Sequence, residues 1–442
     1  ATTTPALVER TAAVFEQHGA DAWYERAADE FVPPDLTCRC GSKTFERERD
    51  ILDVWFDSGS SHLAVLEQRP DLGWPADLYL EGTDQYRGWF QSSLLVGIGT
   101  RARAPYDQVL THGFVVDEQG RKMSKSLGNF VPPQDVIQKS GAEVLRLWAA
   151  MVDYRDEVRL GKEVLARVVE AYRKVRNTMR YLVSNLYDFD PAIDAMPVAE
   201  LEEVDRFALA RYAEAGRRMV DAYERYDYPT IFHTLNTLAT VDLSAFYLDV
   251  SKDRLYTLAA RSRARRSAQT AVYTIADGLA RLVAPVLPVT CEELWRHLPG
   301  TREQSVHLAL FPTNLGRMED PALVDRWTEL NAVRDKVNVV LEGARQQKTI
   351  GNSLTAKVTL RAGGALGELL ARYRDDLPML FIVSEVALER VADGTLDIAV
   401  AKADGTKCPR CWRIVPELVS TGGDADDELC TRCADAIAHA VA

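Results

Sequence analysis

The chain has 442 residues, of which 47% are hydrophobic and 27% are charged. These values are typical of a folded, soluble protein of two to four domains, and they exclude a disordered chain. The net charge of −12 excludes a general electrostatic affinity for nucleic acid, so any RNA-binding surface must be local. No stretch approaches the about 18 uncharged apolar residues that a membrane helix needs.

The first 50 residues are mixed in character and open with ATTTPALVERTAAVF. This stretch has neither an initiator Met nor the charged-then-apolar pattern of a signal peptide. We therefore expect the chain to begin inside a longer protein.

Residues 51 to about 120 alternate between strand and helix patterns. ILDVWFDSGSSH predicts a buried strand that leads into a helix, and DLYLEG predicts a short strand followed by a helix from about Tyr86 to Ile98. QVLTHGFVVD predicts a third strand, closed by a turn from Asp117 to Gly120. This order indicates a parallel α/β sheet, in which ligands bind at the carboxyl ends of the strands.

From about 161 to 298 the pattern is helical and predicts a bundle with its own core. Thr290 to Glu293 has the form of a capping box that opens a helix. Between about 322 and 402 a long helix is followed by two short strands, AKVTLRA and LDIAVAKA, that flank more helix. The last 40 residues contain four cysteines and predict a small unit held together by a metal.

Two runs are rich in arginine and lysine, and each is either a local RNA-binding surface or a solvated helix face. The first run lies in 159–180 and contains Arg159, Lys162, Arg167, Arg173, Lys174, Arg176 and Arg180. The second is RSRARR, with Arg261, Arg263, Arg265 and Arg266.

The seven cysteines are clustered, which favours metal ligation over a disulfide framework. Paired C-x2-C sequences separated by 18 residues predict a tetrahedral zinc site with four thiolate ligands. Four protein ligands leave no open position, so the site is structural, and two disulfides are the weaker alternative. The predicted ligands are Cys408, Cys411, Cys430 and Cys433. Cys291 stands alone and is expected in the core.

The sequence Lys122-Met123-Ser124-Lys125-Ser126 places two lysines three residues apart in a loop flanked by Gly120 and Gly128. Lysine is a compact charge on a flexible stem, suited to stabilising the charge that develops on a departing pyrophosphate. A K-x-x-K loop considered alone is more often a solvated turn.

The longer string GRKMSKSLGN resembles the KMSKS signature of class I aminoacyl-tRNA synthetases. LEGTDQYRGWFQSSLL and ILDVWFDSGSSH resemble the isoleucine branch of that class. So do the downstream strings YRKVRNTMRYLVSNL, LEGARQQKTIGNSLTAKVTL and CPRCW…CTRC, so the resemblance covers nearly the whole chain.

The resemblance implies a multidomain α/β plus α fold with five parts. They are the tail of an inserted, editing-side region (1–50), the second half of a Rossmann-type catalytic domain with the KMSKS loop (51–160), a helical anticodon-binding domain (161–320), a small α/β region (321–402) and a zinc knuckle (403–442).

The resemblance also implies roles for individual residues. Lys125 would contact ATP, assisted by Lys122. His112 and Gly113 would lie near the adenine or the phosphates. A purely structural role is an equally good interpretation for His112. The aminoacyl-adenylate would be bound by Glu81, Gly82, Asp84 and Gln85, with Trp55 and Trp89 as the walls of the isoleucine side-chain pocket. Without the resemblance, core packing would be the preferred interpretation for each tryptophan.

The implied reaction activates L-isoleucine with ATP and Mg²⁺ and transfers it to tRNA-Ile, in a cytoplasmic monomer with one structural Zn²⁺. Cys38 and Cys40 would be half of a second zinc site, and Trp412 with Lys407, Arg410, Arg413 and Arg432 would either touch tRNA or solvate the knuckle. The HIGH motif and the editing region of this class do not occur in the 442 residues. We therefore expect the chain alone not to form isoleucyl-adenylate at a useful rate.

Three alternatives remain open at this stage. The first is a non-catalytic tRNA-binding protein derived from a synthetase, against which the intact KMSKS string, Glu81 and both tryptophans argue. The second is one subunit of a split synthetase that works with a separate chain. The third is a valine or leucine enzyme, which an amino-acid panel would distinguish.

Overall fold

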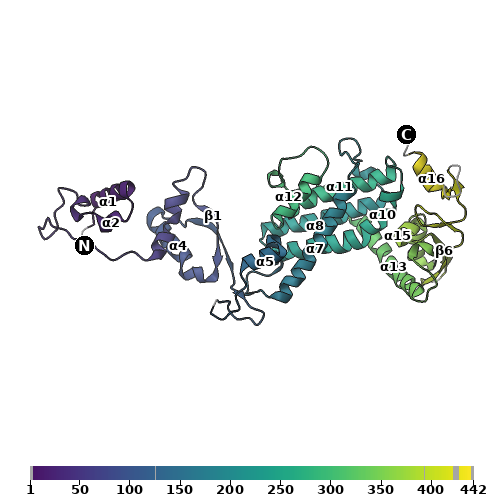
Figure 1. Ribbon diagram of the computed structural model, residues 1–442, viewed down its shortest axis with the longest axis horizontal. Helices are drawn as coiled ribbons and strands as arrows, with labels where there is room; N and C mark the ends of the chain where they lie inside the picture. The colour runs from purple at the N-terminus through teal and green to yellow at the C-terminus, as the bar shows by residue number, and fades with distance from the viewer. Residues whose placement is uncertain (1–2, 125, 393, 422–427, 440–442) are drawn as a thin grey trace. The chain divides into compact units, whose positions relative to one another are not determined.

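A computed structural model describes residues 3–124, 126–392, 394–421 and 428–439 (Figure 1). The chain divides into two compact units, Ala1–His112 and Gly113–Ala442. Within the described ranges, no helix has the length and apolar character needed to cross a bilayer.

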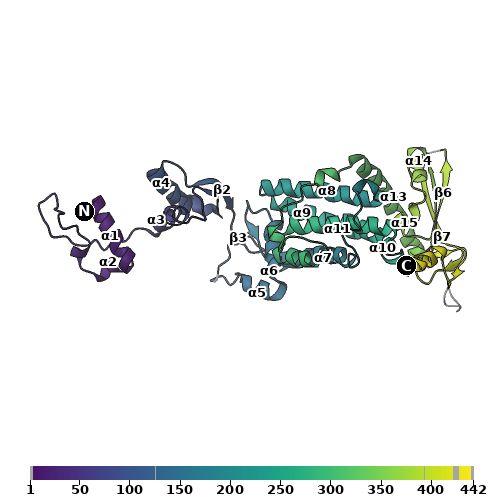
Figure 2. The same cartoon turned by 90° about the horizontal axis from the view of Figure 1, so that it is seen from above.

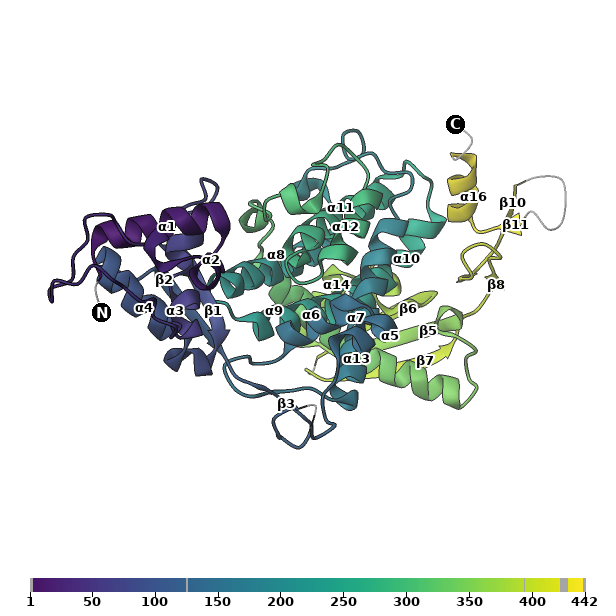
Figure 3. The same cartoon turned by 60° about the vertical axis from the view of Figure 1, so that its left-hand side comes forward.

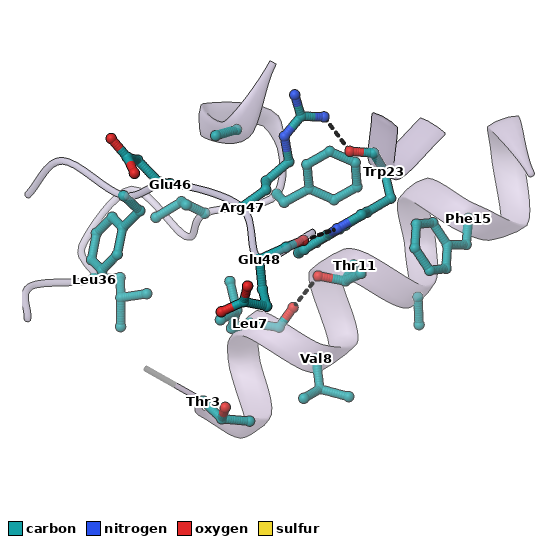
Figure 4. Close-up of a pocket in the computed structure, with 15 residues that line it drawn as sticks. Thr3, Leu7, Val8, Thr11, Phe15, Trp23, Leu36, Glu46, Arg47 and Glu48 are labelled. Carbon is teal, nitrogen blue, oxygen red and sulfur yellow. Dashed lines mark hydrogen bonds between the residues drawn. The ribbon is translucent and has the colours of Figure 1, made fainter. Parts of the chain in front are cut away.

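The first 50 residues fold around a small aromatic cluster. Helix α1 (Pro5–His18) begins where the Thr4 side chain accepts a hydrogen bond from the Leu7 amide, and α2 (Ala22–Glu25) and η1 (Ala28–Glu30) follow. Phe15, Trp23 and Phe31 pack edge to face. Trp23 Nε1 also donates to the Glu48 carbonyl at 2.8 Å, which holds the 45–48 segment beside α1 and forms a pocket of about 520 Å³ (Figure 4).

The rest of the first unit is a two-stranded parallel sheet with helices. Its elements are α3 (Val54–Gly59), η2 (His62–Leu66), β1 (Ala76–Gly82), η3 (Thr83–Arg87), α4 (Trp89–Arg101) and β2 (Tyr106–His112). The strand predicted in DLYLEG and its parallel pairing are confirmed, with Leu78 opposite Gln108 and Gly82 opposite His112.

The buried strand predicted for ILDVWFDSGSSH is wrong. Ile51 is 81% exposed, and the backbone is already helical from Val54 because the Asp53 carboxylate accepts the Trp55 amide at 2.9 Å. The following long helix begins at Trp89 rather than Tyr86, since Thr83–Arg87 form a tighter turn. A polar N-cap and a 3₁₀ turn, both local features, explain these two differences.

The second unit opens with β3 (Val115–Val116), which pairs in parallel with β4 (Val158–Arg159). The single strand predicted in QVLTHGFVVD is therefore divided at Gly113, whose amide donates to the Tyr154 carbonyl at 2.8 Å. The predicted turn is confirmed, because the Gly120 amide donates to the Asp117 carbonyl and Gly120 has φ +76°. Helices α5 (Pro133–Ser140) and α6 (Ala142–Met151) follow.

The predicted helical bundle is confirmed (Figure 2), and its buried apolar side chains form one core. Its helices are α7 (Lys162–Ser184), η4 (Val198–Glu200), α8 (Glu203–Glu224), α9 (Tyr228–Thr237), η5 (Leu238–Tyr247), α10 (Leu248–Thr257), α11 (Arg263–Val283) and α12 (Pro288–His297), with η6 (Val306–Leu308) and η7 (Leu315–Arg317) beyond them. Cys291 is fully buried in this core, as predicted.

The capping box predicted at Thr290 is wrong, because α12 already begins at Pro288. The N-terminus of α12 is instead capped by Glu143 of α6, which accepts the amides of Val289 at 2.8 Å and Thr290 at 3.0 Å. Glu143 also accepts the hydroxyls of Thr290 and Tyr172. A buried carboxylate from elsewhere in the sequence thus replaces a local cap.

The last part of the chain is a small α/β layer followed by the cysteine-rich segment. Helix α13 (Pro321–Gln346) and η8 (Ser353–Thr355) precede β5 (Ala356–Gly363), α14 (Gly364–Arg372), α15 (Leu377–Phe381), β6 (Glu385–Val391) and β7 (Leu396–Lys402). The two predicted strands are confirmed as β5 and β7, which pair antiparallel, and the sheet has the order β6-β5-β7. Strand β6, parallel to β5, was not predicted.

The RSRARR run is not a free basic surface. The side chains of Arg265 and Arg266 are 4% and 12% exposed, and both pair with Asp188. Arg263 donates to the Glu200 carbonyl at 2.5 Å. The second candidate RNA surface is therefore wrong for Arg265 and Arg266, which pair with Asp188, and it stays a prediction for the exposed Arg261 and Arg263.

Candidate functional site

The first group of predicted site residues meets at the carboxyl ends of β1 and β2. Glu81 and Gly82 end β1, His112 ends β2, and Gly82 lies opposite His112 in the register. A Cβ placed on Gly82 would be 3.7 Å from His112 Cε1 and 2.6 Å from Asp84 Oδ1. Glycine therefore leaves room for the Asp84 carboxylate beside the strand end, where parallel sheets bind ligands.

The two predicted tryptophans lie on neighbouring helices of the same unit. Trp89 is fixed: its ring stacks on Tyr79 at 4.2 Å between centroids, and its Nε1 donates to the Ser58 carbonyl at 3.0 Å. Trp55 is 44% exposed and approaches Gly88, where a Cβ would be 3.0 Å from its ring. Trp55 therefore keeps part of its side chain open to solvent beside Gly88.

Gln85 connects this aromatic pair to the strand end. Its side-chain oxygen accepts the Trp89 amide at 2.9 Å, which caps the start of α4. Its amide nitrogen donates to Asp84 Oδ2 at 3.4 Å. The structure thus brings together seven predicted residues at one end of the first unit's sheet: Trp55, Glu81, Gly82, Asp84, Gln85, Trp89 and His112.

The KMSKS loop belongs to the second unit, and Lys125 lies outside the described residues. Lys122 pairs with Val116 in a single bridge, and its ammonium lies 5.0 Å from the centre of the Phe114 ring. Gly113 is pressed against the 154–157 segment, because a Cβ there would come within 2.1 Å of the Asp156 carbonyl oxygen.

Two residues that sequence reasoning missed hold the loop in shape. Asn129 Nδ2 donates to Asp117 Oδ2 at 2.9 Å, and Asn129 Oδ1 accepts the Ser124 amide at 2.9 Å. Asp117 also accepts the Arg121 guanidinium at 2.8 Å. The hydrogen bond from Asn129, with those from Arg121, outweighs burial and holds the Asp117 pKa well below its usual range. The only sequence signal for Asp117 and Asn129 was that these two polar residues lie on either side of Lys122 and Lys125.

The four cysteines of the zinc knuckle form a compact cluster. Their sulfur atoms all lie within 4.8 Å of one another and the four residues are buried. Cys411 Sγ and Cys430 Sγ are 3.7 Å apart, close to the about 3.8 Å expected for two thiolates on one zinc ion and far from the about 2 Å of a disulfide. The geometry fits a structural zinc site.

The environment favours ionised sulfur at Cys408, whereas burial raises the pKa of the Cys411 and Cys433 thiols. Burial opposes ionisation of the Cys408 thiol, but the backbone N–H groups of Cys411, Cys430 and Arg410 outweigh it and lower its pKa to about 6. Backbone N–H groups around a sulfur stabilise the thiolate that binds a metal. Cys38 and Cys40 do not belong to this cluster, and their proposed second site stays a prediction.

Most of the knuckle's positive charge does not face solvent freely. Arg410, Arg413 and Arg432 all make contacts with α10, a role that neither of the two predicted ones, tRNA contact or solvation of the knuckle, included. Lys407 lies 5.5 Å from the centre of the Trp412 ring. Trp412 is 59% exposed and remains the knuckle's one large exposed aromatic side chain within the described residues.

The first predicted basic run lies along α7 and the strand before it. All of its members are exposed except Arg176, which is half-buried and pairs with Glu293 of α12 at 2.8 Å. A pocket of about 530 Å³ opens between α7 and α12, lined by Arg176, Arg180, Tyr187 and His297 among others. This surface combines positive charge with an 81% exposed tyrosine, features used in binding RNA.

Comparison with known proteins agrees with this arrangement. Residues 2–161 match the class I tRNA synthetases (I, L, M and V), residues 205–360 match the anticodon-binding domain of tRNA ligase, and residues 405–436 match the zinc finger found in FPG and IleRS.

Two curated relatives are matched over nearly the whole chain. The isoleucine–tRNA ligase of Geobacter sulfurreducens is 50% identical over 441 residues, which cover 97% of this chain and 47% of that protein. That of Symbiobacterium thermophilum is 49% identical over 456 residues, which cover 98% of this chain and 48% of that protein. The chain thus spans about half the length of these relatives.

A solved structure has the same fold. The LeuRS of Agrobacterium radiobacter K84, in a ternary complex with tRNA and LeuAMS, has a TM-score of 0.51 and 17% identity, and covers 81% of this chain and 44% of that chain. Sequence identity, three family matches and the cysteine cluster point the same way. The chain is homologous to about half the length of isoleucine–tRNA ligases, and it comprises segments that match the class I tRNA synthetases, their anticodon-binding domain and a zinc finger.

Proposed function

We propose that this chain provides the adenylate-binding end of the sheet, the KMSKS loop and the tRNA-binding domains of an isoleucine–tRNA ligase. The reaction activates L-isoleucine with ATP and Mg²⁺ to isoleucyl-adenylate and passes the amino acid to tRNA-Ile. The convergence of Glu81, Gly82 and His112 at the carboxyl ends of β1 and β2 carries the proposal. Relatives at 50% identity support isoleucine as the amino acid.

The residues at the strand ends have chemistry suited to the adenylate. Glu81 is an exposed carboxylate that can pair with the substrate ammonium, and Asp84 and Gln85 can accept or donate hydrogen bonds to ribose hydroxyls. Trp55 and Trp89 would enclose the branched aliphatic side chain. Trp89 is already held by Tyr79 and Ser58, while Trp55 keeps an exposed face for the ligand.

The phosphates of ATP would meet the KMSKS loop. Lys122 and Lys125 supply positive charge toward the departing pyrophosphate, with His112 and Gly113 near the adenine or the phosphates. Removing one such contact typically costs about 3 kcal/mol of transition-state stabilisation, or about two orders of magnitude in rate. Asp117 and Asn129 shape the loop without touching the substrate.

The remaining domains would bind tRNA-Ile. The basic face of α7 is suited to the RNA backbone, and Trp412 beside Lys407 is suited to stacking on an exposed base. The proposal also includes five domains that end at residues 50, 160, 320, 402 and 442, a cytoplasmic location and a monomeric state. A purely tRNA-binding protein would need neither Glu81 nor the tryptophan pair.

The proposal is tested by joining this chain to the part of the Geobacter sulfurreducens ligase that it does not cover. We expect the chimera to exchange pyrophosphate into ATP with isoleucine, and to prefer isoleucine to valine by about 10–200-fold in kcat/KM, a range known from isoleucine enzymes themselves rather than worked out from this structure. Preference for valine, leucine or methionine would contradict it.

A matched pair of substitutions tests the pocket. Trp55→Ala should raise the KM for isoleucine and reduce its advantage over valine. Trp412→Ala, which also removes an exposed tryptophan, should leave pyrophosphate exchange unchanged. Equal effects of the two substitutions would refute the role given to Trp55.

A further inference from the structure

The knuckle is held on α10 by arginines that converge on one carboxylate. Arg432 makes a two-pronged contact with Asp253, at 2.5 Å and 2.8 Å, and Arg413 reaches the same side chain at 3.2 Å. Arg410 donates to the Thr257 carbonyl one turn further along α10. The knuckle (yellow) and α10 lie side by side in Figure 3. We call Arg410, Arg413 and Arg432 the arginine triad.

The same arginine triad is also close to the metal-binding sulfurs. Arg410 Nη1 lies 3.6 Å from Cys433 Sγ while it donates to the Thr257 carbonyl, so one guanidinium touches both the cysteine cluster and α10. Arg413 follows Cys411 by two residues, and its carbonyl accepts the Cys408 amide at 2.9 Å. Arg432 lies between Cys430 and Cys433 in the sequence. Each arginine is therefore tied to the cysteine cluster by contact or by backbone.

The charges explain why the triad's contact with Asp253 and its closeness to the cysteine cluster belong together. A zinc ion with four thiolates carries two net negative charges. The arginine triad and Asp253 together carry two net positive charges, so the assembly of cluster, triad and Asp253 is neutral. Asp253 has a side chain only 24% exposed, and a partly buried carboxylate is stable there only when it is paired. Without the metal, three clustered arginines would face a single carboxylate.

We propose that Asp253 is a positioning residue that docks the knuckle on α10, and that zinc binding and docking stabilise each other through the arginine triad. Coupling between two binding events is reciprocal, so each must strengthen the other by the same factor. Such couplings typically amount to about 5–150-fold in affinity. A second attachment, from the Ile414 amide to Ser384 Oγ at 2.7 Å, does not depend on Asp253.

The test compares two asparagine substitutions on the same helix in the 442-residue chain. Asp253→Asn removes the charge that the triad binds. Asp249→Asn, one turn earlier, removes an equally sized carboxylate that pairs with Lys252 and Arg334 instead. Zinc affinity is measured by competition with a chromophoric chelator, and backbone hydrogen exchange is followed in 405–421 and 428–436. Circular dichroism confirms that both variants remain folded.

We expect Asp253→Asn to weaken zinc binding by at least about fivefold and to accelerate exchange in the knuckle, while Asp249→Asn does neither. Removing zinc from the unsubstituted chain should accelerate exchange at residues 253–257 of α10. Equal zinc affinity and equal exchange in the two variants would overturn the proposal.

Arg432→Lys alone keeps the proposal testable if Asp253→Asn proves unstable, and a double-mutant cycle adds a further test where both variants fold. Arg432→Lys should weaken zinc binding on its own, and combining it with Asp253→Asn should add less than the sum of the two effects, because both break one contact. Full additivity would contradict the proposal.

A last readout rests on the proposed function. In the chimera, Asp253→Asn should raise the KM for tRNA-Ile and leave isoleucine-dependent pyrophosphate exchange unchanged. Zinc affinity and backbone hydrogen exchange can be measured without any enzymatic activity. Failure of the docking proposal is therefore distinguishable from failure of the proposed function.

Discussion

Replacing Glu143 by alanine should open the start of α12. Glu143 is 7% exposed, and its carboxylate accepts hydrogen bonds from the amides of Val289 and Thr290 and from the hydroxyls of Thr290 and Tyr172. Loss of a helix cap costs about 1 kcal/mol. The buried donors left unpaired add about 1–3 kcal/mol, so we expect a total of about 3 kcal/mol.

Hydrogen exchange is the appropriate assay, because a chain of several domains does not unfold in a single two-state step. A loss of about 3 kcal/mol should raise the exchange rates of α12 amides about 100-fold. Glu170→Ala is the control: its carboxylate makes exposed ion pairs with Arg173 and Lys174, worth at most about 1 kcal/mol. Similar α12 exchange in the two variants would refute the capping role of Glu143.

Three further outcomes follow from the described contacts. Gly113→Ala should accelerate hydrogen exchange in β3 and β4, at a cost of about 1–3 kcal/mol, because a Cβ would meet the Asp156 carbonyl. Gly99→Ala should not accelerate exchange in α4, because no atom lies within 4 Å of a Cβ placed there. Because the pKa of Asp117 is lowered in the folded chain, its ionised carboxylate stabilises the loop fully above about pH 4. This stabilisation is lost only as the pH falls through the lowered pKa. The Ser124 amide should therefore keep its protection from exchange at pH 4.5, and Asn129→Ala should abolish that protection at every pH. Chelation of zinc should expose four thiols to a thiol reagent and leave helical circular dichroism nearly unchanged; a large loss of helix would show that the metal supports the whole second unit.

The elements that the sequence predicted well are those whose signal is local. DLYLEG forms β1 and pairs in parallel with β2, the 161–298 region is a helical bundle, and the paired C-x2-C spacing produces a four-sulfur cluster. In each case the residues that define the feature are close in sequence or repeat with a regular period.

The features that escaped prediction depend on partners far away in the sequence. Arg265 is neutralised by Asp188, 77 positions earlier, so a run that looks basic is internally paired. Arg432 binds Asp253 at a separation of 179 positions. Sequence periodicity carries no information about such pairs, since it reports only on neighbours within one helix or strand.

The candidate site was predicted through its resemblance to synthetases rather than from residue chemistry. A lone tryptophan or a K-x-x-K turn has an ordinary structural interpretation, and only the longer strings gave Trp55, Glu81 and Lys125 a role. The supporting residues Asp117 and Asn129 were missed because their importance lies in hydrogen bonds to backbone and side chains across the loop, which no single motif encodes.

The proposed function makes this chain part of an enzyme that attaches isoleucine to tRNA-Ile. Its most direct test is aminoacylation by the chimera with the Geobacter sulfurreducens segment, using radiolabelled isoleucine and transcripts of tRNA-Ile and tRNA-Val. We predict acid-precipitable isoleucine on tRNA-Ile and background levels on tRNA-Val. Equal charging of both tRNAs, or charging of tRNA-Ile with leucine in place of isoleucine, would contradict the claim.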